Sequence, residues 1–194
     1  MSVPPARGPH HPPPVSFRPL ARADFPALGG WLAAEHVRAW WRGVLPAPSG
    51  IDREFGPQAD GTDPTRSFVL LLAGEPAGLF QCYRHADYPA WDSAVGVPGA
   101  AGLDYLIGEP GHCGQGIGTA AISAFTSVVF GLFPEVITLA SVPQKENRAS
   151  CRALEKAGFT LLGERDVVSD DPSDSGISSI YVLPRARPVP AGGG

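Results

Sequence analysis

The run of glycines at 114–118 restricts the fold of this chain more than any other stretch, because it joins an apolar strand pattern to a helical one. Gly114, Gly116 and Gly118 alternate along the run, and apolar residues recur at positions 121, 122, 125, 128 and 129, which is helical spacing. Glycine lets a backbone approach a ligand closely, and the first amides of a helix have no partners within it. Such a loop predicts a phosphate or pyrophosphate site; the alternative is a tight turn without a ligand.

Two common phosphate loops do not fit this run. A P-loop has the pattern GxxxxGK[ST], and no lysine stands at the required position. A dinucleotide-binding loop reads GxGxxG after the first strand of a βαβ unit, whereas this chain reads GxGxG in mid-chain, after a hairpin pattern. The class of ligand must therefore be inferred from the rest of the chain.

The composition indicates a single globular domain. The chain has 194 residues, of which 43% are hydrophobic, enough for one core. The net charge of −4 argues against nucleic acid, which needs clustered Lys and Arg. No apolar run reaches the length of a membrane span and no secretory signal is visible, so we expect a cytoplasmic protein with no membrane partner. Cys82, Cys113 and Cys151 lack CxxC spacing, so we expect neither a disulfide framework nor a metal site.

Strand and helix patterns alternate between two tails. Residues 1–14 are rich in proline and 185–194 resemble a second loose segment, so we expect flexible tails on one domain at 15–184. The alternation predicts an α/β fold with a mixed sheet flanked by helices. The expected elements are a strand at 15–20, two short helices within 25–41, a hairpin at 67–86, a strand at 101–108, a helix at 119–133, a strand at 135–142, a helix at 147–159, and strands at 160–168 and 176–184.

Local residues predict where the helices begin and end. Asp24 is expected to cap the first helix, and Gly29 and Gly30 are expected to divide that region into two helices. Asn147 is expected to cap the helix at 147–159, and Gly158 to end it. These residues therefore set the boundaries of the helical segments.

A second segment gives the glycine run a specific meaning. The segment GQGIGTAAISAF, followed after one strand pattern by ENRASCRALEKAGF, resembles the GCN5-related N-acetyltransferase (GNAT) superfamily. The resemblance implies the GNAT fold, with a mixed and mostly antiparallel central sheet, and acetyl-coenzyme A (acetyl-CoA) as cofactor. It also implies that the glycine loop binds the pyrophosphate and that the later segment packs beside the pantetheine arm.

The resemblance assigns the cofactor contacts to three segments of the chain. A backbone N–H at Leu106 or Ile107 is expected to polarise the thioester carbonyl, a contact that leaves no side-chain signature. Cys113 stands where the superfamily often has Arg or Gln. This difference is tolerable, because backbone amides make most of the contact with the pyrophosphate. The implied cofactor-binding residues are Leu106, Ile107, Cys113, Gly114, Gln115, Gly116, Gly118, Thr119 and Asn147.

Asp104 is the candidate catalytic residue, because a carboxylate within an apolar strand is costly unless it is solvated, paired or used. It lies in GLDYLIG, on the same strand face as Leu106. This segment, with WLAAEHVRAWW, AGEPAGLFQCY and EKAGFTLLGE, resembles the branch that holds aminoglycoside 6′-N-acetyltransferases, whose catalytic Asp falls on Asp104. Siderophore acyltransferases of the same branch tend to have His there, and an Asp where Gln144 stands. The alternative is that Asp104 only caps a strand end.

The group that protonates the leaving thiolate is the main open point. Many members of the superfamily have Tyr where this chain has Leu154, and leucine cannot donate a proton. Water, the incoming ammonium or another tyrosine must then supply the proton, or the enzyme uses no acid at all.

An aminoglycoside pocket should combine carboxylates with flat aromatic surfaces, because these ligands are sugars with several ammonium groups. Adjacent tryptophans at 40 and 41 cannot both point into the core of an amphipathic helix, and the acidic run at 169–175 falls between the last two strands. Core packing and a solvated loop are the alternatives for these two features. The expected substrate-binding residues are Glu35, Trp40, Trp41, Trp91, Asp92 and Asp171.

Three functions follow from these residues. The first is an aminoglycoside 6′-N-acetyltransferase that uses acetyl-CoA, confers resistance and acts as a monomer or homodimer. The second is a siderophore-type acyltransferase that acts on an N-hydroxylated lysine side chain. The third is a non-catalytic acyl-CoA-binding module, which the leucine at position 154 motivates.

Overall fold

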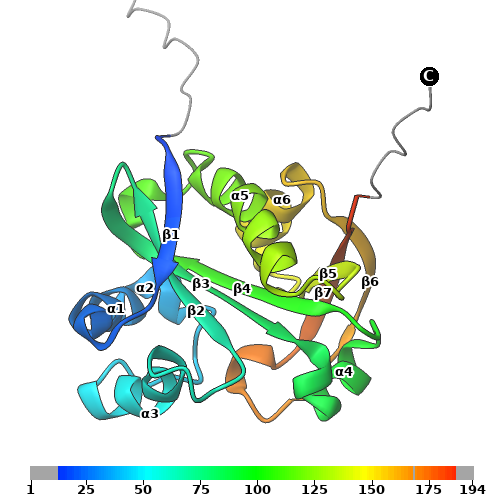
Figure 1. Cartoon of the computed structure of the whole chain (residues 1–194), viewed down its shortest axis with the longest axis horizontal. Helices are drawn as coiled ribbons and strands as arrows, with labels where there is room; N and C mark the ends of the chain where they lie inside the picture. The colour runs from blue at the N-terminus through cyan, green and yellow to red at the C-terminus, as the bar shows by residue number, and fades with distance from the viewer. Residues whose placement is uncertain (1–12, 168, 187–194) are drawn as a thin grey trace, which may run out of the picture.

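The computed structural model describes residues 13–167 and 169–186. Most of the expected N-terminal tail and residues 187–194 of the expected C-terminal tail lie outside the described residues. Within the described part, the chain forms a central sheet with helices on both faces (Figure 1). No helix in this part has the length and apolar character that a membrane span requires.

The sheet has seven strands in the order β1-β2-β3-β4-β5-β7-β6. All neighbouring pairs are antiparallel except β4 and β5, which are parallel. Ala73 and Gly74 form the turn of the β2–β3 hairpin, both with positive φ, as a type I′ hairpin turn requires. The strands are β1 (Val15–Pro19), β2 (Arg66–Leu72), β3 (Glu75–Arg84), β4 (Ala101–Ile107), β5 (Thr138–Ser141), β6 (Thr160–Asp166) and β7 (Ile177–Pro184).

The helices form one layer on each face of the sheet (Figure 1). On one face lie α5 (Ile117–Leu132) and α6 (Arg148–Lys156). The other layer contains α1 (Phe25–Ala33), α2 (Glu35–Arg38), α3 (Pro48–Ala59) and α4 (Pro89–Val95). Short 3₁₀ turns occur at Arg22–Asp24, His85–Asp87, Pro110–His112 and Pro172–Asp174.

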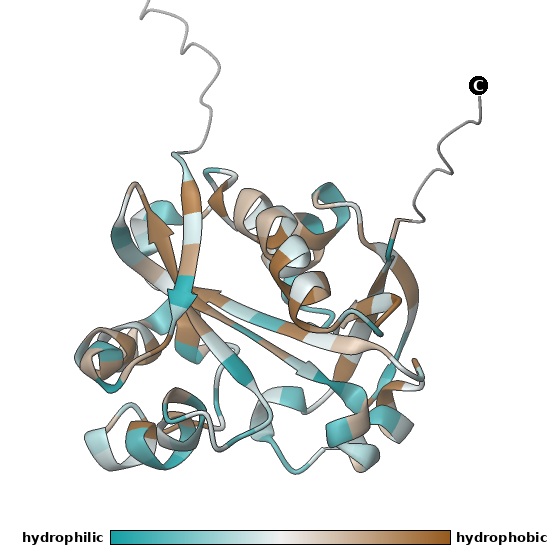
Figure 2. Ribbon diagram, viewed as in Figure 1, coloured by the Kyte–Doolittle hydropathy of each residue, from teal (hydrophilic) through white to brown (hydrophobic). Residues whose placement is uncertain are grey.

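Each layer has its own apolar core, because neighbouring residues of a strand point to opposite faces. Phe80 of β3 and Phe125 of α5 are fully buried in the core beneath α5 and α6. Leu79 of β3 and Phe55 of α3 are fully buried in the core on the other face. Figure 2 shows hydrophobic residues along the strands and on α5. The sheet is therefore covered on both faces, as the predicted mixed α/β fold requires.

The structure corrects two details near the N-terminus. α1 continues through Gly29 and Gly30 and ends at Ala33, and the break falls at Ala34, which has extended φ and ψ angles. The Asp24 carboxylate does not cap α1, because it binds the Arg18 guanidinium at 2.6 and 2.7 Å and accepts the Ala21 amide. The Asp24 carboxylate therefore pairs with Arg18 of β1 and does not cap the helix.

Two helices in the first half were missed by the sequence analysis, and one strand is shorter than expected. α3 and α4 both begin with proline and have glycine or proline within or just after them, so their helical periodicity is weak. β5 covers only Thr138–Ser141 of the strand expected at 135–142. The predicted roles of Asn147 and Gly158 agree with the structure, since the Asn147 side chain accepts the Ser150 amide and Gly158 follows α6 with φ of 97°.

The parallel pair at the centre of the sheet separates after a short contact. β4 and β5 pair only at Ala101 with Leu139 and Gly102 with Ala140. The Ser141 hydroxyl donates to the Leu103 carbonyl at 2.8 Å, and β5 then ends while β4 continues to Ile107. The second half of β4 thus faces a gap in the sheet, which we call the strand split (the space beside residues 103–107 of β4).

Candidate active site

A cavity of about 400 Å³ opens at the strand split. Tyr105 of β4, Ser150 of α6 and Asn147, which caps α6, line it from the α6 side, whereas Asp104 and Tyr83 line it from the opposite face of the sheet. This follows from strand alternation, which sends neighbouring side chains of β4 to opposite faces. The cavity therefore passes through the sheet and connects its two sides.

The cavity wall combines negative charge with aromatic surface. None of the described residues that line it is Lys, Arg or His. Flat rings and carboxylates without a protein counter-ion attract organic cations. The carboxylates are Glu54, Asp63, Asp104, Asp171 and Asp174, and the aromatic residues are Trp40, Trp41, Tyr83, Tyr88, Trp91 and Tyr105.

Asp104 is part of this wall, and its surroundings favour the protonated acid. Burial in the cavity wall raises the pKa of Asp104 to about 7, and the negative charge of Asp174 adds to this effect. Interaction with the Tyr83 hydroxyl acts in the opposite direction. A carboxyl group whose pKa is close to neutrality can take a proton and release it again, as a general base must.

Two other carboxyl groups of the cavity have perturbed pKa values. Burial raises the pKa of Glu54, and the nearby charges of Asp171 and Asp63 add to the shift. Burial likewise raises the pKa of Asp174, again with a contribution from Asp171. Carboxylates that repel one another in this way are stabilised by any ligand that brings positive charge.

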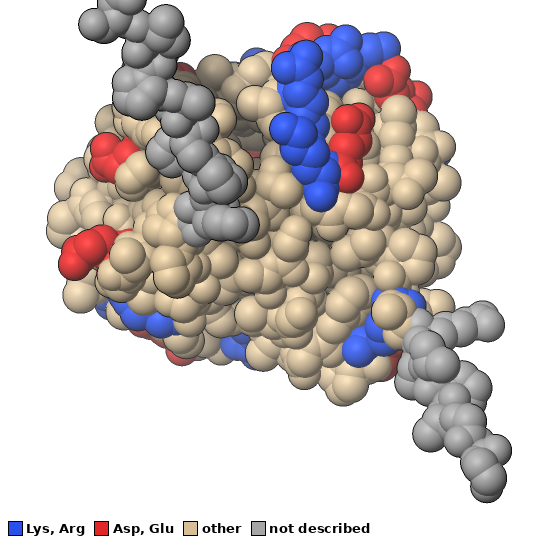
Figure 3. Space-filling model, turned by 90° about the horizontal axis from the view of Figure 1, so that it is seen from above, with Lys and Arg blue, Asp and Glu red and all other residues tan. Residues whose placement is uncertain are grey.

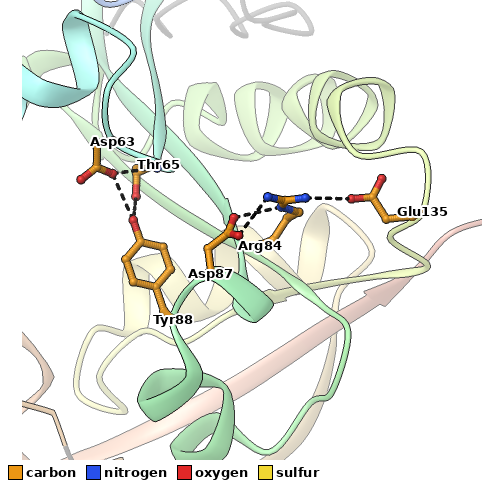
Figure 4. Close-up of polar contacts among 6 residues, drawn as sticks. All are labelled: Asp63, Thr65, Arg84, Asp87, Tyr88 and Glu135. Atoms are coloured by element: carbon orange, nitrogen blue, oxygen red, sulfur yellow. Dashed lines mark hydrogen bonds and ion pairs between the residues drawn. The ribbon is translucent and has the colours of Figure 1, made fainter.

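Hydrogen bonds fix the far side of the cavity. The Tyr88 hydroxyl lies 2.6 Å from the Thr65 hydroxyl and donates to Asp63 at 3.1 Å (Figure 4). The neighbouring Arg84 binds Asp87 at 2.9 Å and Glu135 at 3.7 Å in the same view, and it does not line the cavity. Arg84 is therefore paired with carboxylates outside the cavity and does not neutralise the carboxylates that line it.

The glycine run forms a loop that leads directly into α5. Gly114 and Gly116 have φ of 74° and 80°, values that side chains other than glycine rarely adopt. The first backbone hydrogen bond of α5 runs from the Ala120 amide to the Gly116 carbonyl. No side chain caps this end of α5. The amides of the first turn, at Ile117, Gly118 and Thr119, are therefore free to bind an anion at the positive end of the helix.

The loop fits the diphosphate of a CoA-type cofactor. No atom lies within 4 Å of the position that a Cβ would take on Gly114 or Gly116, so the surface above the loop is open. Arg148, Arg152 and Lys156 are exposed at four-residue spacing along α6, which packs against α5. Figure 3 shows basic side chains gathered on the face that carries these two helices. Free amides and nearby cations together suit a polyphosphate ligand.

The amides of Leu106 and Ile107, neighbours in β4, point in opposite directions. The Gly108 amide donates to the Ala77 carbonyl of β3 at 2.8 Å. Because successive amides of a strand point in opposite directions, the Ile107 amide faces the strand split and the Leu106 amide faces β3. The Ile107 carbonyl lies 2.9 Å from Nε2 of His36 on α2, which holds the end of β4 in place.

The structure brings the expected catalytic residue together with four of the six expected substrate residues. Trp40, Trp41, Trp91 and Asp171 line the cavity with Asp104 and Asn147. Cys113 is exposed beside the glycine run, and the Gln115 side chain donates to the Gly111 carbonyl within the loop.

Two expected substrate residues do not line the cavity. Glu35 is exposed on α2, and Asp92 of α4 lies 3.5 Å from His85, behind the cavity wall. Asp92 points inward from α4 toward a buried histidine, which a residue pattern alone does not reveal.

Several residues that line the cavity were not predicted from the sequence. Glu54 and Gln58 lie on α3, the helix that had no clear periodicity. Asp63 and Thr65 follow that helix, and Tyr88 precedes α4. Single polar residues in irregular segments carry no recognisable spacing, so only the tertiary contacts identify them.

The fold and the site define a class of protein that binds an anionic cofactor on one side of a split sheet and a cationic ligand on the other. Comparisons with known proteins specify this class. A family model described as an acetyltransferase (GNAT) domain matches residues 21–167. The chain belongs to the GNAT acetyltransferase family, and it is an acetyl-CoA-dependent N-acetyltransferase, as the glycine run and the later segment predicted.

Individual relatives cover most of the chain. An aminoglycoside N(6′)-acetyltransferase type 1 of Klebsiella pneumoniae is 28% identical over 178 residues, which is 90% of this chain and 88% of the relative. The lysine N-acyltransferase MbtK of Mycolicibacterium paratuberculosis is 26% identical over 165 residues, 83% of this chain and 72% of the relative. The structure of AAC(6′)-Ib with parmomycin and acetyl-CoA superposes with a TM-score of 0.77 at 27% identity, covering 88% of this chain and 93% of that one.

Proposed function

We propose that this enzyme transfers the acetyl group of acetyl-CoA to the 6′-amine of an aminoglycoside antibiotic and thereby confers resistance. The observation that carries the proposal is the cavity at the strand split, with five carboxylates, six aromatic side chains and no basic residue among the described residues that line it. An aminoglycoside complements this wall, because its ammonium groups pair with carboxylates and its sugar rings stack on aromatic rings. We further propose that the enzyme works in the cytoplasm as a monomer or homodimer.

The donor side follows from the loop and the strand split. The amides at the start of α5 hold the diphosphate, and Asn147 lines the path of the pantetheine arm toward β4. The cofactor supplies an activated thioester. Of the two amides expected to polarise its carbonyl, that of Ile107 faces the split, so we assign the oxyanion contact to Ile107.

The acceptor side depends on Asp104. In its ionised form the carboxylate accepts a proton from the substrate ammonium, and the free amine then attacks the thioester carbonyl. Removing a proton from the attacking group in this way contributes about 10²–10⁴ in rate. The remaining carboxylates of the cavity, including Glu54, Asp63 and Asp171, hold the other ammonium groups in place.

An acyltransferase for N-hydroxylated lysine is the second candidate, because the lysine N-acyltransferase MbtK is also similar to this chain. Such an acceptor presents one reacting nitrogen, and a wall with five carboxylates has more negative charge than that nitrogen requires. An aminoglycoside, which carries several ammonium groups, therefore complements the cavity wall better than an N-hydroxylated lysine does. Membership of an acetyltransferase family argues against the third candidate, a non-catalytic binding module.

Release of the CoA thiol tests the proposal. The purified enzyme is supplied with acetyl-CoA and with neomycin, which has a 6′-amine, or with paromomycin, which has a hydroxyl group at that position. We expect thiol release with neomycin and none above background with paromomycin. Release with an N-hydroxylated lysine derivative but with neither antibiotic would establish the second candidate instead.

A further inference from the structure

The leaving thiolate needs a proton donor, and the strand split contains few. Leu154 of α6 is fully buried and has no donor atom. The Ser141 hydroxyl is occupied by its bond to the Leu103 carbonyl. The remaining hydroxyl groups on this side of the cavity belong to Tyr105 and Ser150, whose oxygen atoms lie 2.7 Å apart.

Tyr105 occupies the position on β4 that suits the donor side. It follows Asp104 directly, so the two side chains leave the strand on opposite faces. Its ring stacks on Phe80 with the ring centroids 5.3 Å apart, and its hydroxyl contacts α6 one helical turn before Leu154. One residue thus faces the amine and the next faces the thioester sulfur, across the same stretch of strand.

The surroundings of the Tyr105 hydroxyl keep it protonated. Burial raises the pKa of this phenol above its ordinary value, and the Ser150 hydroxyl opposes the shift only in part. A protonated hydroxyl can donate a hydrogen bond to developing negative charge, and such bonds to charged groups are stronger than those between neutral groups. Tyr105 therefore has both the position and the protonation state of an acid.

We propose that Tyr105, held by Ser150, is the general acid that protonates the thiolate of CoA. This inference rests on the proposed acetyl transfer. The amine nitrogen forms a bond to the acetyl carbon, the carbon–sulfur bond breaks, and its electron pair passes to sulfur together with the Tyr105 proton. The new N–H⁺ loses its proton through water, which restores the phenol. In sum, one ammonium and one thioester give one amide, one thiol and one released proton.

The test measures the thiol pKa of bound CoA, a quantity that needs no acceptor. The ultraviolet absorbance of the thiolate is titrated with pH for CoA bound to the wild type, to Tyr105→Phe and to Ser150→Ala. A hydrogen bond from Tyr105 should lower the thiol pKa below that of free CoA, and Tyr105→Phe should raise it again by about 1 unit. Ser150→Ala should give a smaller shift in the same direction, because it removes only the partner that positions the phenol.

Tyr181→Phe is the matched control. Its hydroxyl also contacts an α6 side chain, donating to Glu155 at 2.8 Å, but it does not line the cavity, so the thiol pKa should not change. In Tyr105→Phe the ring and its stacking on Phe80 remain, so we expect a folded protein with turnover reduced about 10²-fold. An unchanged thiol pKa in Tyr105→Phe would overturn the assignment even if the wild type acetylates neomycin. If neomycin is not acetylated but the thiol pKa still rises in Tyr105→Phe, the proposed acceptor would be rejected and the assignment of Tyr105 would stand.

Discussion

At the scale of single residues, the proposed chemistry depends on Asp104 and Tyr105, whose side chains leave β4 on opposite faces. The sequence predicted a catalytic role for Asp104, because a carboxylate inside an apolar strand is costly. Tyr105 carries no such signal in the sequence, because an aromatic residue in a strand is ordinary. The role proposed for Tyr105 rests on the contact of its hydroxyl with Ser150, which is 45 residues away in the chain.

Asp104→Asn should remove the base and leave the cavity shape intact. The carboxylate form is active and its pKa is about 7, so wild-type kcat/KM should fall as the pH drops below 7. The variant should lose about 10²–10⁴ in kcat/KM at pH 8 and should lack this acidic limb. Steady-state rates between pH 5.5 and 9 check both expectations.

Asp170→Asn is the control for net charge. Asp170 is exposed and does not line the cavity, so this variant should keep the rate and the pH profile of the wild type. An Asp104→Asn enzyme with the wild-type profile would show that another group accepts the proton.

At the scale of elements, the glycine loop and α5 form the unit to which we assign anion binding. The sequence predicted both from local information, since glycine spacing and helical periodicity are properties of neighbouring residues. α6 was equally clear from its cap and its terminal glycine. α3 and α4 were missed because proline and glycine obscure their periodicity and tertiary packing stabilises them.

Gly116→Ala tests the loop as an element. Gly116 has φ of 80°, and a side chain there should cost roughly 1–2 kcal/mol in the free energy of unfolding. The substitution should also weaken CoA binding, because the amides of the first turn lose their alignment. Urea denaturation and calorimetric titration with CoA measure the two effects.

Gly131→Ala provides the comparison within the same helix. Gly131 lies in α5, has no positive φ, and no atom lies within 4 Å of its missing Cβ. Alanine should therefore stabilise the protein by about 0.5–1 kcal/mol and leave CoA binding unchanged. Equal CoA affinity in both variants would contradict the role of the loop conformation.

At the scale of the whole molecule, the cavity exists because the sheet opens between β4 and β5. Donor and acceptor sides meet there, and a buried histidine supports the wall from behind. His85 is fully buried, stacks on Tyr83 with centroids 6.0 Å apart, and has no hydrogen-bond partner on either ring nitrogen among the described residues. Tyr83 in turn lines the cavity.

His85 should make stability depend on pH. Burial lowers the pKa of His85, and Asp92 opposes this shift in part. A histidine that stays neutral when folded takes up a proton more readily when unfolded, so its contribution to stability is lost as pH falls below about 6.5. The raised pKa of Asp104 has the opposite sign in this range, so the wild type alone does not isolate the effect.

A comparison of the wild type with His85→Phe isolates the contribution of His85 to the pH dependence of stability. Phenylalanine keeps the stacking on Tyr83 and cannot be protonated. The wild type should lose more thermal stability than the variant between pH 8 and pH 5, in scans that record Tm for both proteins. A parallel pH dependence of the two Tm values would mean that His85 does not titrate in this range.

The sequence by itself determined the donor half of this protein. The glycine run, the Asn147 cap, the end of α6 at Gly158 and the strand that carries Asp104 are all set by residues close in the chain, where spacing and φ preferences act. The sequence also predicted part of the acceptor half, since Asp104, the three expected tryptophans and Asp171 line the cavity. Only the tertiary structure added the remaining residues. Glu54, Asp63 and Tyr88 come from separate segments, and their effect depends on shared burial and on the charge of neighbouring carboxylates, which arise only when the chain has folded around the split between β4 and β5.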